Sequence, residues 1–424
     1  MRQHTLFFDL LVTFIIISYS AFSAAAAEAP PPPPPPCSLN GDKDNITGVC
    51  ICDKPWTGID CEILQLLPVS FPQGYGMSPQ KTTWGGDVLF QNGKYHLYAS
   101  AMRSNCSLRH WHSQSQIEHA VSDRITGPYE FQHVAVPAFS HNPKVIQLAD
   151  GKLALIHIGT GSESTVVAEN NECSSGLLSS GSIPMQNNER KLRHTSTDAT
   201  EGGSTIHLAD SPDGPWKPLL NHTLGHCNNP APFVVFASCE KAHIIYVVCS
   251  QGGYGQLKRA NNIRGPWETV STLAPSEDNE NDDDSKKISY EDPALWIDQR
   301  GFHIIWHAYI WDENPPHGHD CRTSTVAKYM FSQDGKQWYN APGHPYGTQI
   351  EVRGQGNVTV ATRERPSLIF ETKKPGALNG QSRMTYLLNA VCSAPNCPDG
   401  PPAGCVNCKY DHWDYTLIQP LAVA

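Results

Sequence analysis

Carboxyl side chains at three places in this chain could supply acid–base chemistry. Glu291 and Glu364 each stand two residues before a proline, and Asp87 follows Trp84 and two glycines. A protonated carboxyl can give a proton to one side of a scissile bond, while an ionised one activates water or attacks on the other. Because neighbours on a strand point to opposite faces, we expect that Glu291 and Asp292 cannot both serve. The second carboxylate must then come from Asp87 or Glu364.

Polar and aromatic residues near these carboxyls are candidates for binding a ligand. Asn229 cannot ionise but can hydrogen-bond hydroxyl groups, and Arg365 could pair with Glu364 or bind an anionic group. Structural explanations stay open for all of them, since a short polar residue before proline commonly caps a turn and buried histidines and tryptophans usually pack. Glu291 itself could be a structural hydrogen-bonding group. The ligand-binding candidates are Asn142, Asn229, Asp292, Arg365, Trp84 and His141.

The segment 288–311 shows the kind of element that positions these residues. Residues 294–297 form a short apolar run after a proline, and 302–307 alternate between two faces, which predicts two strands joined by a turn at 298–301. A third strand is predicted at 326–332 and a short edge strand at 337–338. The unit therefore begins at a polar residue and a proline and ends at a Gly-x-x-Trp turn.

The same unit occurs five times, starting near residues 86, 143, 230, 293 and 366. Closing turns recur as well, three of them Gly-Pro followed by an aromatic residue, in which we expect glycine to take an unusual dihedral and the ring to pack between blades. Repeats of about four strands predict a five-bladed β-propeller, because stacking around an axis buries both faces of each sheet. We expect 415–418 to pair near 66–71 and close the ring.

Irregular spacing between the repeats indicates insertions. Residues 161–203 are rich in Ser, Asn and Thr and are predicted to form a long loop. Residues 277–287 are acidic; they could bind calcium, but lack the glycine and spacing of an EF-hand, which favours a solvated loop. Four cysteines at 392, 397, 405 and 408 could bind zinc by spacing, although disulfides are favoured in a secreted chain.

The N-terminus predicts secretion. Residues 1–27 have the charge, apolar run and small-residue cleavage options of a signal peptide, and 28–36 form a proline-rich linker. The alternative is an uncleaved anchor that tethers the protein to the membrane. Fourteen cysteines suit an oxidising, extracellular location. Glycosylation sequons begin at Asn45, Asn105, Asn221 and Asn357.

Composition excludes some partners and favours one fold class. Charged residues make up 17% of the 424 residues, and the formal net charge is −10 without a basic stripe, which argues against nucleic acid. Glycine and proline number 33 and 34, which favours many turns and an all-β fold. The sequence has no G-x-S-x-G, P-loop or H-E-x-x-H motif.

Residues 37–61 resemble the C-terminal half of an EGF-like module, through the pattern C-x-C-x8-C with Trp56-Thr57-Gly58 before the last cysteine. The resemblance implies disulfides Cys37–Cys50 and Cys52–Cys61, and the two absent cysteines would be partners of each other. So small a module needs such links. Prolines replace the acidic residues of calcium-binding variants, so calcium is not expected here. The module could be a spacer, a contact for another protein, or a cap on the next domain.

Residues 64–424 resemble the family 43 glycoside hydrolases and their five-bladed relatives of families 32, 62, 68 and 117, in the Asp-Pro-like blade starts and Gly-Pro-Trp turns. The resemblance implies cleavage of a sugar at the propeller axis by a first-blade base, a third-blade Asp and a fourth-blade acid. The acid falls on Glu291, but the third-blade Asp falls on Asn229 and the base on Gly85 or Gly86, with Asp87 nearby.

The sequence thus predicts an all-β chain, a five-bladed β-propeller with a small disulfide-stapled N-terminal EGF-like module. The expected function is glycoside hydrolase-like action on an extracellular poly- or oligosaccharide, with Glu291, Asp87 and Glu364 as candidate catalytic carboxyls. The alternative is a catalytically inactive propeller that binds carbohydrate or protein. We expect no cofactor, although a calcium ion at the axis is compatible with the fold.

Overall fold

The computed structural model describes residues 32–423, with gaps at 72, 79–80, 107, 109–110, 163–202, 237–242, 252–253, 274–286, 312–326, 361, 372–382 and 393–413. The chain divides into Met1–Pro34 and a compact unit, Pro35–Ala424, which contains the small module and the propeller. The expected signal peptide lies outside the described residues. Within the described part, no helix has both the length and the hydropathy to cross a bilayer.

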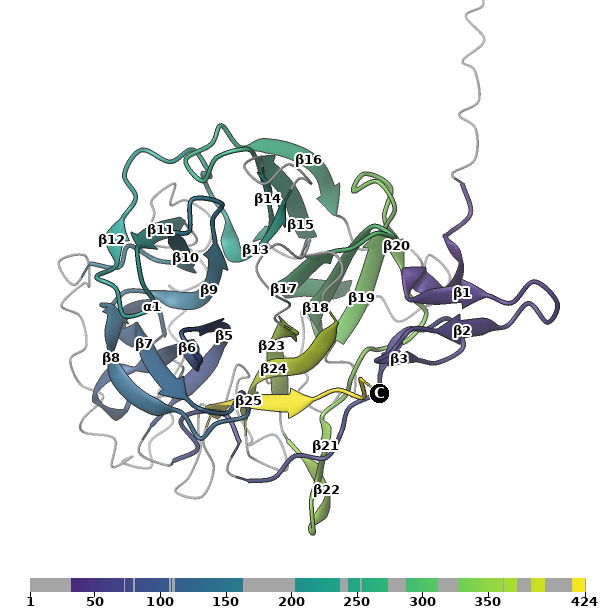
Figure 1. Ribbon diagram of the computed structural model, residues 1–424, viewed down its shortest axis with the longest axis horizontal. Helices are drawn as coiled ribbons and strands as arrows, with labels where there is room; N and C mark the ends of the chain where they lie inside the picture. The colour runs from purple at the N-terminus through teal and green to yellow at the C-terminus, as the bar shows by residue number, and fades with distance from the viewer. Residues whose placement is uncertain are drawn as a thin grey trace, which may run out of the picture. The chain divides into compact units, whose positions relative to one another are not determined.

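Five antiparallel sheets surround a common axis, as the view down that axis shows (Figure 1). In each sheet the first strand in sequence is innermost. The predicted all-β, five-bladed propeller is therefore confirmed. The strands, blade by blade, are β5 (Thr83–Gln91), β6 (Lys94–Met102), β7 (Ser115–Ser122), β8 (Glu130–Val136); β9 (His141–Gln147), β10 (Leu153–Ile158), β11 (Ser204–Ala209), β12 (Lys217–Pro218); β13 (Asn228–Phe236), β14 (His243–Gln251), β15 (Tyr254–Ala260), β16 (Glu268–Leu273); β17 (Lys287–Ile297), β18 (Phe302–Trp311), β19 (Ala327–Ser332), β20 (Tyr339–Asn340); and β23 (Thr362–Phe370), β24 (Met384–Cys392), β25 (Asp414–Pro420).

Each blade buries its two faces against its two neighbours. In the fourth blade, Ile304 and Trp306 pack with Leu257 of the third blade, while Ile305 belongs to a cluster that includes Leu387 of the fifth. The alternation predicted for 302–307 therefore assigns these faces correctly. Apolar clusters of this kind fill the other blade interfaces too, which is the burial that a single four-stranded sheet could not achieve.

The edge strand of the fourth blade begins later than predicted. We expected it at 337–338, but β20 spans Tyr339–Asn340. The carboxylate of Asp334 accepts hydrogen bonds from the backbone N–H groups of Lys336 and Gln337, at 2.8 and 2.9 Å, so the turn continues through these residues. Trp338 then donates its indole N–H to Ser271 of the third blade and joins the interface cluster.

The closing turns have the predicted conformation. The φ angles of Gly127, Gly214 and Gly265 are 82°, 81° and 100°, in the region that only glycine adopts readily. The aromatic residue after each Gly-Pro packs against a neighbouring element: Tyr129 is buried with residues of the fifth blade, and the ring of Trp216 lies edge-on to that of Tyr98 in the first. The turns thus link successive blades.

Among the described residues the fifth blade has three strands, and the N-terminal segment of the propeller completes it. Isolated bridges join Leu66 to Leu421 and Tyr75 to Thr416, both antiparallel. The backbone N–H of Leu67 donates to the carbonyl of Pro420 at 2.8 Å. This confirms the predicted ring closure by the end of the chain against the segment that begins near residue 66. A hairpin of β21 (Gln349–Val352) and β22 (Gly356–Thr359) lies between the fourth and fifth blades in sequence.

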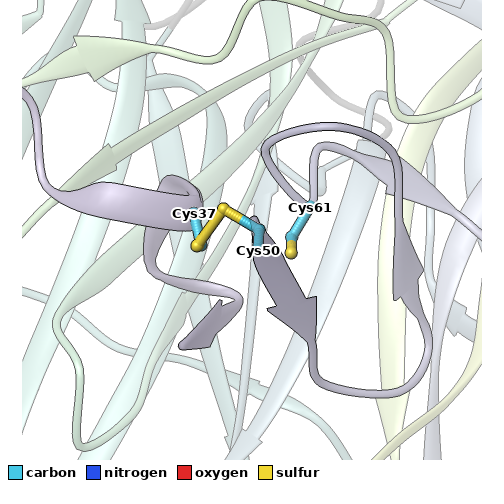
Figure 2. Close-up of side chains that lie close together, drawn as sticks. All are labelled: Cys37, Cys50 and Cys61. Atoms are coloured by element: carbon cyan, nitrogen blue, oxygen red, sulfur yellow. A yellow bond between two sulfur atoms is a disulfide. The ribbon is translucent and has the colours of Figure 1, made fainter. Parts of the chain in front are cut away.

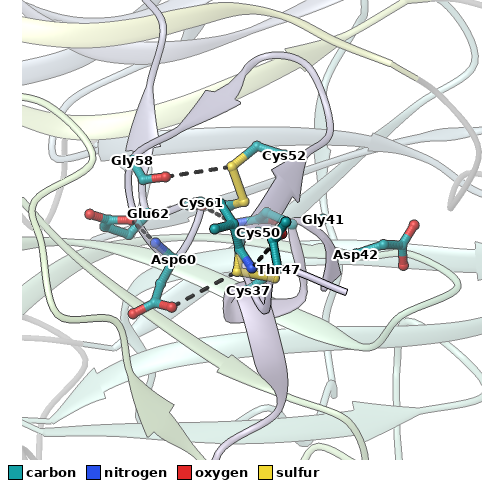
Figure 3. The surroundings of a disulfide bond; sticks show 12 residues. Cys37, Gly41, Asp42, Thr47, Cys50, Cys52, Gly58, Asp60, Cys61 and Glu62 are labelled. Atoms are coloured by element: carbon teal, nitrogen blue, oxygen red, sulfur yellow. Dashed lines mark hydrogen bonds between the residues drawn. A yellow bond between two sulfur atoms is a disulfide. The ribbon is translucent and has the colours of Figure 1, made fainter. Parts of the chain in front are cut away.

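The small module contains both expected disulfides, Cys37–Cys50 and Cys52–Cys61 (Figures 2 and 3). Its elements are the 3₁₀ helix η1 (Pro36–Leu39), β1 (Gly41–Lys43), β2 (Cys50–Cys52), β3 (Trp56–Thr57) and β4 (Ile63–Leu64). The remaining helices within the described residues are η2 (Arg103–Asn105) and α1 (Trp111–Gln114).

The module packs directly on the fourth blade rather than hanging from it as a free spacer. The ring of Trp56 stacks on Tyr329 and Trp296, with centroid distances of 5.0 and 6.0 Å. The Tyr329 hydroxyl donates to the Ser38 carbonyl at 2.8 Å. Arg300, in the turn between β17 and β18, bonds the Asp42 carboxylate. Module and propeller therefore share one apolar core.

Other sequence predictions divide between described and undescribed residues. Asn45, Asn221 and Asn357 are exposed, as glycosylation would require, and the glycans stay a prediction; the exposure of Asn105 lies outside what is described. Cys392 is disulfide-bonded, which supports disulfides over zinc there, whereas its three neighbouring cysteines are not described. A further disulfide, Cys227–Cys249, lies in the third blade. Most of 161–203 and of 277–287 falls in the gaps.

Candidate functional site

A β-bulge near the start of each inner strand aims one residue toward the axis. The register shifts in β5, β9, β13, β17 and β23 at equivalent places, and the bulged residue has a positive φ of 47–60° in every blade. Bulges commonly re-aim side chains in this way. Asn, Asp and Gly tolerate that conformation best, which explains most of the residue types. The five residues are Gly85, Asn142, Asn229, Asp292 and Arg365.

The five positions surround the axis and are called the ring here, and hydrogen bonds connect the side chains of four of them. Asn142 Nδ2 donates to Asn229 Oδ1 at 2.6 Å, and Arg365 Nη1 donates to the same oxygen at 3.1 Å. Arg365 Nη1 also forms an ion pair with Asp292 Oδ1 at 2.5 Å, and both side chains are only 5% exposed. Gly85 contributes no side chain. A Cβ built there would lie 3.1 Å from Arg365 Cβ, so the arginine occupies that side of the axis.

The carboxyl groups of Glu291, Asp292 and Glu364 lie together at the end of the axis where the inner strands begin. His307 Nδ1 lies 3.8 Å from Asp292 Oδ2 and 3.7 Å from Glu364 Oε2. Asn229 Nδ2 donates to Glu291 Oε1 at 3.2 Å. Glu291 and Glu364 are partly buried, and they come from β17 and β23 of adjacent blades. The sequence-predicted Glu291, Glu364, Asp292, Asn229, Asn142 and Arg365 are thus brought together.

One argument from the sequence was wrong. We expected adjacent Glu291 and Asp292 to point to opposite faces of the strand. Ligand atoms of Glu291, Asp292 and His307 all lie within 4.8 Å of one another. The cause is the bulge, because Asp292 has a φ of 50° and the strict alternation of the strand is broken between residues 291 and 294.

Burial and charge set the protonation of Glu364. Loss of solvent raises the pKa of this carboxyl well above its usual value, and the nearby carboxylates of Asp292, Glu291 and Asp414 raise it further, while Arg365 opposes them. Burial and these neighbouring charges therefore favour the protonated form of Glu364 more than the carboxyl of a free glutamate. Burial raises the pKa of Asp292 as well, but the paired guanidinium of Arg365 and the ammonium group of Lys144 oppose that rise. The two groups have different environments within one cluster, as acid–base chemistry requires.

Asp87 does not belong to this cluster, which corrects the sequence prediction. Its carboxylate accepts hydrogen bonds from the Val145 N–H and the Ser367 hydroxyl, both at 3.0 Å. Lys144 provides the opposite charge nearby, and burial lowers the pKa of this lysine to about 8. The reason is again the bulge: Asp87 follows the glycine pair, one step farther along β5 than the ring.

Asp87, Lys144 and Ser367 border a cavity of about 450 Å³. Its other lining residues come mostly from the later parts of the inner strands, such as Phe233 and Phe370, so it opens at the opposite end of the axis from the three carboxyl groups. The volume suits a small ligand. We nevertheless place the candidate site at the carboxyl cluster, because the acid chemistry is there.

Two further predicted binding residues are buried. Trp84 is 3% exposed and packs with Met102 and Ala390, so its ring is no platform for a ligand. His141 is 4% exposed, with its Nδ1 2.7 Å from the Ser115 hydroxyl oxygen and its ring 5.2 Å from that of Trp111. Both serve packing, the structural alternative that the sequence left open for them.

Sequence reasoning missed three functional neighbours. His307 is not among the candidate residues that the sequence suggests, but β18 pairs it directly with Glu291. The turn at 298–301, once recognised, sets the hairpin register that brings the two together. Lys144 follows Asn142-Pro143 at the place that Asp87 takes in the first blade, a correspondence visible in the repeats. No sequence pattern marks Asp414, which is buried and acts on Glu364.

A calcium ion fits this cluster poorly. Calcium takes six to eight oxygen ligands, as a rule. Here the group that could hold an ion includes an imidazole, and Asp292 already pairs with Arg365, whose positive charge would repel a second cation. We therefore derive no chemistry from calcium.

Comparisons with known proteins give fold neighbours only. No protein-family profile matches the chain, and no curated protein matches its sequence. Solved structures with a similar arrangement include a family 62 glycoside hydrolase in complex with xylotriose (TM-score 0.48, 10% identity, 85% of this chain and 97% of that one). A thermostable family 43 glycoside hydrolase gives a TM-score of 0.45 at 13% identity, covering 83% and 92%. A family 117 glycoside hydrolase from Zobellia galactanivorans gives 0.44 at 12%, covering 85% and 91%. Similarities of this size do not decide what this chain does.

Proposed function

We propose that this protein is a glycoside hydrolase of extracellular glycans, with Glu364 and Glu291 as its pair of carboxyl groups. The observation that supports this is the meeting of two glutamates from adjacent blades around His307, one of which has its pKa raised by burial and neighbouring charge. The disulfides of the module and the third blade suit an extracellular location.

The two glutamates would divide the chemistry. Glu364 gives its proton to the glycosidic oxygen, which lets the leaving sugar depart as a neutral alcohol. Glu291, which accepts a hydrogen bond from Asn229, acts as the ionised partner that activates water or attacks the sugar carbon. Asp292 stays paired with Arg365 and positions that arginine and Asn229. This assigns the acid to Glu364 rather than to Glu291, on which the family resemblance would place it.

The test uses nitrophenyl and alkyl glycosides of arabinose, xylose, fructose and galactose with wild type, Glu291→Gln and Glu364→Gln. Loss of a general acid matters least when the leaving group is already acidic, so Glu364→Gln should keep more activity on nitrophenyl than on alkyl glycosides. Glu291→Gln should lose about 10²-fold or more on both. Glu268→Gln, an exposed glutamate of the third blade, is the matched control. Equal inactivity of all four proteins would reject the hydrolase.

A catalytically inactive carbohydrate-binding propeller is the second candidate, and a specific observation favours it. The ring has Gly85 where the resemblance implies a base and Asn229 where it implies an aspartate, and its remaining carboxylate is neutralised by Arg365. Binding of oligosaccharides by calorimetry, with no release of reducing sugar over days, would support this candidate. Loss of that binding in Glu291→Gln would locate the carbohydrate-binding site at the axial carboxyl cluster.

A further inference from the structure

A second cluster of polar side chains lies away from the axis, at the boundary of the first and second blades. His96 and His119 come from β6 and β7, and Asp213 from the turn between β11 and β12. His96 Nδ1 lies 2.9 Å from His119 Nε2, and His119 Nδ1 lies 3.9 Å from Asp213 Oδ1. Ligand atoms of the three residues are all within 4.8 Å of one another. His133 of β8 places its ring 4.9 Å from that of His119.

The hydrogen bonds fix where the protons are. His96 Nε2 faces the Gln91 carbonyl at 3.3 Å, and a carbonyl only accepts, so this nitrogen carries the hydrogen. His96 Nδ1 is then an acceptor, and His119 Nε2–H donates to it. His119 Nδ1 is therefore left with a lone pair. It is fully buried and has no hydrogen-bond partner among the described residues.

Two electron-pair donors thus face each other across a gap. The lone pair of His119 Nδ1 and the carboxylate of Asp213 cannot hydrogen-bond without a proton between them. Zinc binds histidine nitrogen and carboxylate oxygen at about 2.0–2.2 Å, so an ion that bridges both atoms with a bent angle spans the observed 3.9 Å. No strand has to move, because Asp213 is 72% exposed and can adjust.

The surroundings have further features of a metal site. A metal-bound histidine usually donates its other ring N–H to an acceptor, which orients the ring, and His119 does so toward His96. The turn that carries Asp213 is anchored by the Tyr98 hydroxyl, which donates to the Pro212 carbonyl at 2.7 Å. His133, whose side chain makes no hydrogen bond in the described part of the chain, is near enough to become a third ligand by rotating.

We propose that His119 and Asp213 bind a divalent transition-metal ion, with zinc as the representative, and that His133 and water complete its coordination. Imidazole with carboxylate is a donor set that suits zinc and its neighbours better than calcium or magnesium. Because the two ligands belong to different blades, the ion would link the first blade to the second. Bound metal would therefore stabilise the propeller without taking part in the chemistry at the axis.

The experiment treats the full chain with chelator, then titrates it with Zn²⁺ by calorimetry and with Co²⁺ by visible absorption, and records the melting temperature with and without Zn²⁺. One ion should bind, and the melting temperature should rise with Zn²⁺. Asp213→Asn should weaken binding at least tenfold and abolish the rise, while its melting temperature in chelator should equal that of wild type, because the side chain is exposed.

Asp210→Asn, also exposed and three residues away, is the matched control and should bind like wild type. His119→Gln should abolish zinc binding. Because His119 is buried, this variant could fail to fold, and the exposed Asp213→Asn variant then provides the test of the site. The proposal is overturned if no ion binds at millimolar Zn²⁺, or if Asp213→Asn binds as tightly as wild type.

Discussion

Arg365 of the fifth blade fills the space at the axis that a side chain on Gly85 of the first blade would need. A Cβ on Gly85 would lie 3.1 Å from Arg365 Cβ and 3.2 Å from its Cδ. The two positions are equivalent in their blades and adjacent around the ring. A large residue at one therefore requires a small one at the other, and the missing first-blade carboxylate is tied to the presence of this arginine.

Gly85→Asp should destabilise the protein by about 2–4 kcal/mol, from the strain of a side chain at a φ of 60° and from overpacking against Arg365. Urea unfolding followed by tryptophan fluorescence would measure it. The double variant Gly85→Asp with Arg365→Ala should be destabilised by less than the sum of the two single effects, because removal of the arginine side chain opens the space. Additive effects would show that the two side chains do not compete.

Arg365→Met should cost about 3–5 kcal/mol of unfolding free energy, since it leaves the buried Asp292 carboxylate without its cation. The double variant Arg365→Met with Asp292→Asn removes both charges. Its stability should lie closer to wild type than that of Arg365→Met alone. A double variant no better than the single one would mean that the charge of Asp292 is compensated by another group.

The blades were predictable because their repeats are governed by local rules. Proline after a polar residue, alternating faces and Gly-Pro-aromatic turns are each visible in a few neighbouring residues. The ring at the axis was predictable only as a set of positions. Which ring residues bond each other depends on four side chains from four blades, and Asn229 accepts from two of them.

The bulge explains the two errors at the site. A strand without it would separate Glu291 from Asp292 and leave Asp87 beside the axial carboxyls. The positive φ at Asp292 and Gly85 reverses both expectations. Four of the five bulges have proline after the inward residue, which is a sequence sign that was present but had been assigned to turn capping. The docking of Trp56 on Tyr329 spans most of the chain and has no local sign.

Trp56→Ala should lower the stability of the whole propeller by about 3–5 kcal/mol, because Trp56 is 6% exposed and packs into a core shared by module and fourth blade. Ile51→Ala, at an exposed site of the same module, should change stability by no more than about 0.5 kcal/mol. Thermal unfolding by calorimetry is the measurement. A separate early transition for the module, with the propeller unaffected, would contradict the shared core.

The buried pair His157 and His207 should make the protein sensitive to acid. Burial lowers their pKa values to about 3 and about 4. The unfolded chain binds protons below about pH 6.5 and the folded one does not, so stability is lost as pH falls from there, by up to about 1.4 kcal/mol per pH unit for each histidine. His207→Asn keeps an N–H donor toward His157 Nε2. Urea unfolding from pH 8 to pH 4.5 should show a shallower loss in this variant than in wild type.

Glu364 should act in the opposite direction, because its pKa is raised in the folded state. Above the unfolded pKa of about 4.3 the unfolded chain releases this proton while the folded one keeps it, so stability falls as pH rises, by up to about 1.4 kcal/mol per unit until the folded pKa is passed. Glu364→Gln is a neutral isostere that carries no such proton. We expect the free energy of unfolding of Glu364→Gln, measured with urea between pH 4 and pH 9, to be close to that of wild type at pH 4. It should exceed the wild-type value by a growing amount as the pH rises. A constant difference across that range would show that Glu364 is ionised in the folded protein, and it would remove the proton donor on which the proposed hydrolysis depends.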